Sequence, residues 1–124
     1  MGEIKFGFED LEVWKKAIEF AYKVIQLTEK LDTDRKHYRL IEQLEDCSVS
    51  VASNIAEGKG RYSKKEFVQF LYIARGSLFE SITQLIILNK NRWIHDDDLE
   101  ELKVMGDEIG KMLSSLINSF KKSI

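Results

Sequence analysis

The sequence predicts an all-α protein with the fold of an antiparallel, up-down-up-down four-helix bundle. Three observations predict this fold. The 124 residues include no proline, so long helices can continue without interruption. Apolar residues recur at alternating three- and four-residue spacing in four segments, which is the periodicity of an amphipathic helix. The connections 32–38 and 92–95 are short, and short connections place neighbouring helices antiparallel. We expect residues 1–124 to form one domain.

The first two helices are expected over about residues 10–31 and 39–57. Gly58 and Gly60 follow the second helix. Helices commonly end at a residue with positive φ, and glycine adopts this conformation without a steric cost. We therefore expect these two glycines to end the second helix and to open a tight turn at the centre of the chain.

The third and fourth helices each begin at a recognisable cap. Ser63 and Glu66 have the Ser-x-x-Glu spacing of a capping box, which predicts a third helix over about 64–91. Asp96 is a good N-cap for a fourth helix over about 97–121, and the two aspartates after it suit the positive end of a helix dipole.

Composition narrows the class of protein. Hydrophobic residues make up 44% and charged residues 32%, which is too apolar for a disordered chain and too polar for a membrane span. The N-terminus has no apolar signal core. Cys47 is the only cysteine, so an intrachain disulfide is impossible, and we interpret it as a small buried hydrophobe. We expect a cytoplasmic protein that does not enter a membrane.

The first and third helices carry more apolar surface than one bundle core requires. Each has two apolar stripes, on the order of 110° apart around the helix, whereas the fourth helix has a single apolar face. A helix that is apolar on two faces normally covers a partner, so we expect a homo-oligomer; tolerated surface hydrophobes are the alternative. The candidate interface residues are Val13, Phe20, Val24, Leu27, Val68, Tyr72, Phe79, Ile82 and Ile86.

A polar network is expected among the helices. Arg75 lies within an apolar stripe, where an unpaired guanidinium would be costly, so a carboxylate partner is predicted from Glu57, Glu80 or Asp46. Asn54 lies at the edge of the second helix's apolar stripe, where its amide would fix register or anchor the turn. We expect this network to be structural; a ligand or hydrolytic site around Asn54, Glu57 and Arg75 is the alternative.

The motifs of enzymes are missing. His37 and His95 fall in predicted connections and lack the Glu-x-x-His spacing of di-iron bundles. The sequence has no phosphate-binding glycine loop, dinucleotide-binding motif or nucleophile elbow. We therefore predict a non-enzymatic protein without catalytic residues, cofactor or metal.

Charge argues against extensive nucleic-acid binding, with one exception. Nineteen Lys and Arg against 21 Asp and Glu give a net charge of −2. In an up-down bundle, however, the second connection lies at the same end as both termini, and its cations are Lys59, Arg61, Lys64 and Lys65. In a ring, this end would be repeated around the axis as a basic surface for phosphates. RNA or DNA is therefore an alternative partner.

Several segments resemble a known family. Residues 8–17, 40–44, 50–58 (Ser-Val-Ala-Ser-Asn-Ile-Ala-Glu-Gly) and 73–80 (Ile-Ala-Arg-Gly-Ser-Leu-Phe-Glu) are similar to the bacterial four-helix-bundle family named for the 23S rRNA intervening-sequence protein. The resemblance implies a homopentamer. It also implies a fold like that of the diversity-generating retroelement accessory protein, a basic pentameric barrel that engages a reverse transcriptase and nucleic acid.

The chain departs from that family pattern at two places. The loop before the second helix lacks the usual proline, and Glu45 and Asp46 stand where paired arginines are expected. The second change removes positive charge from one helix face and weakens the nucleic-acid expectation. The leading prediction is therefore a non-enzymatic, homo-oligomeric scaffold, with five subunits implied by the resemblance. The alternative is a nucleic-acid-binding or reverse-transcriptase accessory ring.

Overall fold

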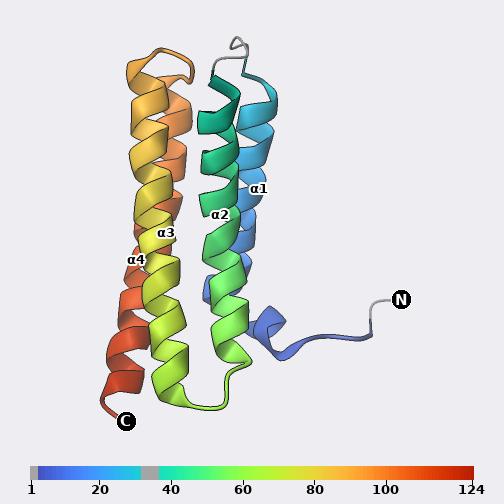
Figure 1. Ribbon diagram of the computed structural model, residues 1–124, viewed down its shortest axis with the longest axis vertical. Coiled ribbons are helices and arrows are strands. Elements are labelled where there is room, and N and C mark those ends of the chain that lie inside the picture. The colour runs from blue at the N-terminus through green and yellow to red at the C-terminus, as the bar shows by residue number, and fades with distance from the viewer. Residues whose placement is uncertain (1–2, 32–36) are drawn as a thin grey trace.

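The computed structural model describes residues 3–31 and 37–124. These residues form four α-helices and one short 3-10 helix, in the order η1 (Gly7–Asp10), α1 (Glu12–Glu29), α2 (Tyr38–Lys59), α3 (Lys64–Lys90) and α4 (Asp96–Lys121). The α-helices run alternately up and down, each packs against the next, and α1 also packs against α4 (Figure 1). The predicted all-α four-helix bundle is confirmed.

The first predicted helix, 10–31, is shorter than expected at both ends, since α1 is Glu12–Glu29. Leu11 has extended backbone angles (φ −74°, ψ 122°), so α1 begins only at Glu12 and η1 precedes it as a separate turn. The Phe6 N–H donates to the Glu9 carboxylate at 2.8 Å, which satisfies a free amide at the start of η1. The predicted connection 32–38 lies mostly outside the described residues.

The fourth helix begins one residue earlier than predicted. Its N-cap is His95, which has extended angles (φ −77°, ψ 155°), and Asp96 is already helical. The His95 N–H donates to the Asp98 carboxylate at 3.4 Å, and Asp96 instead accepts from the Asn89 side chain at 2.9 Å. The Asp96 side chain therefore ties the end of α3 to the start of α4 rather than capping its own helix.

The cap of α3 is confirmed, and Gly60 ends α2 as predicted, but the positive φ predicted for the two glycines is wrong. The Ser63 hydroxyl accepts from the Glu66 N–H at 3.2 Å, as an N-cap should. Gly60 ends α2 at an ordinary φ of −81°, and Gly58 lies inside α2. A Cβ on Gly58 would lie 2.6 Å from Phe70 Cβ and 2.9 Å from Phe67 Cδ1. Gly58 is thus explained by the close approach of α3 to α2, not by positive φ.

The core is formed by large apolar side chains from all four helices, and each helix has two bundle neighbours. This geometry accounts for much of the second apolar stripe on α1 and α3, since one stripe is not enough to cover two neighbours. Twelve of the largest core side chains are less than 2% exposed: Val13, Phe20, Val24, Leu44, Ile55, Leu71, Leu78, Leu85, Leu88, Ile109, Leu113 and Ile117.

α3 is the most apolar helix in the described part of the chain. By length and composition it passes the test for a helix that could cross a membrane, although only 33% of its most apolar 18-residue window is buried in the protomer. Core helices of globular proteins pass the same test. Its inner side packs against α2 and α4, so its outer side is the part that the bundle does not cover.

Candidate functional site

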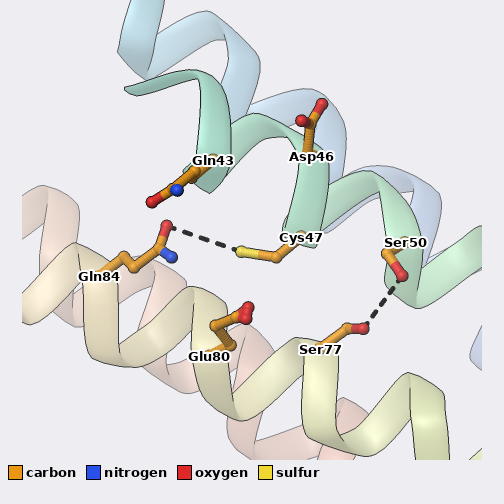
Figure 2. Close-up of a pocket in the computed structure, with 7 residues that line it drawn as sticks. All are labelled: Gln43, Asp46, Cys47, Ser50, Ser77, Glu80 and Gln84. Carbon is orange, nitrogen blue, oxygen red and sulfur yellow. Dashed lines mark hydrogen bonds between the residues drawn. The ribbon is translucent and has the colours of Figure 1, made fainter. Parts of the chain in front are cut away.

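A polar groove runs between α2 and α3 in the middle of the bundle (Figure 2). It has a volume of about 460 Å³. Figure 2 shows Gln43, Cys47 and Gln84 directed toward one another, and the Ser50 and Ser77 hydroxyls meet at 3.0 Å. The lining side chains are Gln43, Asp46, Cys47, Ser50, Ser77, Glu80 and Gln84.

The cysteine of the groove is buried and hydrogen-bonded. Cys47 is 8% exposed, and the Ser81 hydroxyl donates to its sulfur at 3.1 Å. Burial raises the pKa of the Cys47 thiol, so the nucleophilic thiolate is disfavoured at neutral pH. Neither a histidine nor a lysine lines the groove to accept its proton. The arrangement fits a small packed side chain better than a nucleophile.

The predicted network of Asn54, Glu57, Arg75 and Glu80 does not come together. Asn54 donates to the Ser50 carbonyl and hydroxyl, both at 2.8 Å, within its own helix. Glu57 pairs with Arg61 at 2.8 Å, and Glu80 lies exposed at the α2–α3 groove.

Asn54 is linked to α3 only through an intermediary. Its amide holds the Ser50 hydroxyl, and that hydroxyl forms the hydrogen bond to Ser77 of α3. The expectation of a structural amide at the α2–α3 contact therefore agrees with its geometry.

Arg75 lies on the opposite side of α3, against α4. Its Nη1 donates to the Ser114 hydroxyl at 3.0 Å, and its guanidinium carbon lies 5.0 Å from the centre of the Tyr72 ring. Arg75 and Glu80 are about 140° apart around the helix, since successive residues are separated by about 100°. This angle explains why Arg75 cannot share the groove with Glu80, and the predicted carboxylate partner is replaced by a hydroxyl.

Two of the four cations of the predicted basic end have partners within the protomer. The Lys64 ammonium donates to the Ser123 hydroxyl at 3.3 Å, so the α2–α3 connection and the C-terminus lie at one end (Figure 1). Arg61 pairs with Glu57 and lies 4.6 Å from the centre of the Phe70 ring. Lys59, Arg61, Lys64 and Lys65 are all exposed.

The nine candidate interface residues divide by burial. Four of them lie in the protomer's own core and have almost no surface to offer a second copy, which corrects their assignment: Val13, Phe20, Val24 and Val68. Leu27, Ile82 and Ile86 are half-buried. Tyr72 and Phe79 are 39% and 57% exposed.

The outer side of α3 carries apolar residues that the stripe analysis missed. Ile73 is 51% exposed and Ile87 is 43% exposed, and with Phe79 they form what we call the α3 outer band. Gly76 lies between Ile73 and Phe79 in the sequence, and a Cβ placed on it would meet nothing within 4 Å. A continuous scan of exposure around the helix, rather than a search for two stripes, would have found this band.

Comparison with known proteins identifies the family. The model for the 23S rRNA-intervening sequence protein family matches residues 9–115. The chain belongs to this family. The matched segment includes α1, α2, α3 and most of α4, and thus every helix that lines the α2–α3 groove.

A solved structure supports the family assignment. The chain is similar to a protein of unknown function from the S23 ribosomal protein family of Bacteroides thetaiotaomicron, with 28% sequence identity and a TM-score of 0.79. The similarity covers 85% of this chain and 97% of that one. No curated protein matches the sequence significantly. Lys121 and Lys122, near the C-terminus, lie beyond the segment that matches the family.

Proposed function

We propose that this member of the 23S rRNA-intervening sequence protein family is a non-enzymatic, homo-oligomeric scaffold that assembles as a pentameric ring in the cytoplasm. A second copy of the chain covers the α3 outer band. The number five rests on the resemblance of family members to homopentamers. The proposal includes no cofactor, no metal and no membrane contact.

The observation that carries the proposal is Gly76. A glycine inside an α-helix costs about 1 kcal/mol relative to alanine, because it loses more conformational freedom on folding. At Gly58 and Gly106 this cost is offset by close packing within the protomer. A Cβ at either position would lie less than 3.0 Å from a neighbouring side chain. Gly76 has open space around it and gains nothing within the protomer. A helix from a second copy that approaches closely at Gly76 would explain it.

The neighbours of Gly76 support the same proposal. Ile73 and Phe79 expose roughly half of their surface on the side of α3 turned away from the core. Over all sides of the helix, 33% of its most apolar window is buried in the protomer. Contiguous exposed apolar surface is typical of interaction sites. The raised pKa of Cys47 supports a non-enzymatic role, because the one thiol of the chain is kept protonated.

A matched pair of charge substitutions tests the assembly. Phe79→Glu places a charge in the α3 outer band, whereas Val104→Glu places one at an exposed apolar residue of α4, with 57% and 61% of the original side chains exposed. We expect light scattering to show that Phe79→Glu lowers the particle mass and that Val104→Glu does not. Equal masses for both variants and the parent would contradict the proposal.

A nucleic-acid-binding or reverse-transcriptase accessory ring is the second candidate function. Its supporting observation is the Lys64 to Ser123 contact, which brings the α4 C-terminus with Lys121 and Lys122 beside the α2–α3 connection. Substitution of Lys59, Arg61, Lys64 and Lys65 by Glu should then abolish salt-sensitive RNA binding and leave assembly intact. Parent protein that binds no RNA at low salt would remove this candidate.

A further inference from the structure

Arg75 of α3 and Lys121 of α4 each contact an uncharged side chain of the other helix, on the side of α3 opposite the polar groove. The Lys121 ammonium donates to the Tyr72 hydroxyl at 3.1 Å and lies 5.6 Å from the centre of the same ring that Arg75 approaches from 5.0 Å. Arg75 also donates to the Ser114 hydroxyl. Two positive charges are therefore held by one tyrosine ring and two hydroxyl groups.

Arg75 differs from the other half-buried cations of the described residues. Lys16 and Lys23 form ion pairs with Glu108 and Glu101, whereas Arg75 forms none. Lys121 is exposed, like the other described Lys and Arg side chains without an ion pair. Within residues 3–31 and 37–124, no carboxylate lies within ion-pair distance of Arg75 or Lys121. The C-terminal end of the α4 dipole favours Lys121, but Arg75 is in the middle of α3 and has no such compensation.

A hollow reaches Arg75 through Ser114 and offers room for a ligand, although neither Arg75 nor Lys121 is itself part of the wall. It has a volume of about 560 Å³ and lies between Phe79 of the α3 outer band and α4, where Gly110 contributes no side chain. Its wall includes Ser114, the hydroxyl partner of Arg75, together with Ser115 and Asn118, whose side chains are hydrogen-bond donors. The one carboxylate in the wall, Asp107, is paired with Lys111 at 3.0 Å.

We propose that Arg75, Lys121 and the hollow beside Ser114 bind a phosphate group. A phosphate supplies the negative charge that both cations lack, and its oxygens accept from the guanidinium, the ammonium and the hydroxyl or amide donors of the wall. The Tyr72 hydroxyl positions the Lys121 ammonium. None of the four cations of the α2–α3 connection is part of the site. Arg75 lies within the family-matched segment and Lys121 lies beyond it, so the match does not cover the whole pair.

Titration of the full-length protein with inorganic phosphate, followed by ³¹P NMR line broadening at low salt, tests the site. Arg75→Gln combined with Lys121→Gln should weaken binding by roughly tenfold or more, since both charge-assisted contacts are lost. The control is Lys90→Gln combined with Lys103→Gln, which makes the same change in net charge on the same two helices. The control should change affinity by less than about twofold, because only long-range, salt-screened attraction is altered.

Single-stranded DNA with and without a 5′-phosphate distinguishes the sources of the phosphate. If internal phosphodiesters bind, the paired Gln variant should bind both oligonucleotides with a weaker dependence on salt. The slope of the logarithm of the binding constant against the logarithm of salt concentration should decrease in magnitude by about 0.7 for each lost contact. If a terminal phosphate binds, only the 5′-phosphorylated strand should respond. Tyr72→Phe, which keeps the fold and both charges, should cause a smaller loss than the paired variant.

Two results would overturn the proposed phosphate site. Phosphate that binds the paired Gln variant as tightly as the Lys90 and Lys103 control, with matching circular dichroism spectra, would show that these cations form no site. Absence of measurable binding to the parent protein by inorganic phosphate and by both oligonucleotides would overturn it as well.

Discussion

Substitution of Gly76 is predicted to have opposite effects on the protomer and on the assembly. Leucine is a good helix former, so Gly76→Leu should stabilise the isolated protomer by about 0.5–1 kcal/mol. A Cβ at Gly76 would meet no atom of the protomer within 4 Å, so the first carbon of the new side chain is accommodated. Against a second copy, the added side chain would fill the space that a closely packed helix needs.

The cost to assembly follows from overpacking. Forcing extra methylene groups into a packed contact typically costs about 1–3 kcal/mol, which weakens association roughly 5- to 150-fold at each interface. Light scattering over a dilution series should show the parent as an oligomer at concentrations where Gly76→Leu has dissociated. Ser119→Leu is the matched control, because it adds the same side chain at an exposed position of α4 and should leave the mass unchanged.

The gain in protomer stability must be measured in a protein that does not assemble. In Phe79→Glu protein, addition of Gly76→Leu should raise the free energy of urea-induced unfolding by about 0.5–1 kcal/mol. The reasoning is refuted if Gly76→Leu keeps the parent's mass at every concentration. It is also refuted if the substitution destabilises the dissociated protomer, because Gly76 would then have a role within the bundle.

Three further predictions concern the protomer. Gly58→Ala should destabilise the fold by about 1–2 kcal/mol in urea unfolding, because the new Cβ would lie 2.6 Å from Phe70 Cβ and this overpacking exceeds the gain in helix propensity; unchanged stability would show that α3 can move aside. Ser63→Ala should cost about 1 kcal/mol through the lost N-cap of α3, measured in the same way, whereas Ser123→Ala should cost little. Because burial raises the folded pKa of the Cys47 thiol, its contribution to stability is present below the unfolded pKa of about 8.5 and is lost as the pH rises past it. Unfolding curves from pH 7 to pH 10 should show this loss in the parent and not in Cys47→Ser, and equal slopes would contradict it.

Local signals predicted the helices well because caps, short connections and helical periodicity act within a few residues. Ser63 and the positions of α2, α3 and α4 are examples. The boundaries failed where a local alternative was available. Leu11 is extended because η1 closes as a turn of its own, and His95 replaces Asp96 as N-cap because Asp96 bonds to Asn89 instead.

The candidate sites were harder to predict, because they depend on which side of each helix faces its neighbours. Tertiary packing, rather than local sequence, sets this orientation. Two apolar stripes on α1 suggested an outer partner, but α1 has two neighbours inside the bundle, so Val13, Phe20 and Val24 are all buried there. Arg75 was assigned to the Asn54 network because sequence spacing does not reveal which neighbour a half-buried residue faces. Its actual partner, Ser114, is 39 residues away in the sequence.

The most direct test of the account is the mass of the purified protein, measured by light scattering behind size-exclusion chromatography at low salt, with the 260 to 280 nm absorbance ratio recorded across the peak. We predict a mass near five times the 14.5 kDa of one chain, with an absorbance ratio typical of protein alone. A ratio that is high at low salt and falls in high salt would favour the nucleic-acid-binding ring. A mass of one chain at all concentrations would contradict the claim that a second copy covers the α3 outer band.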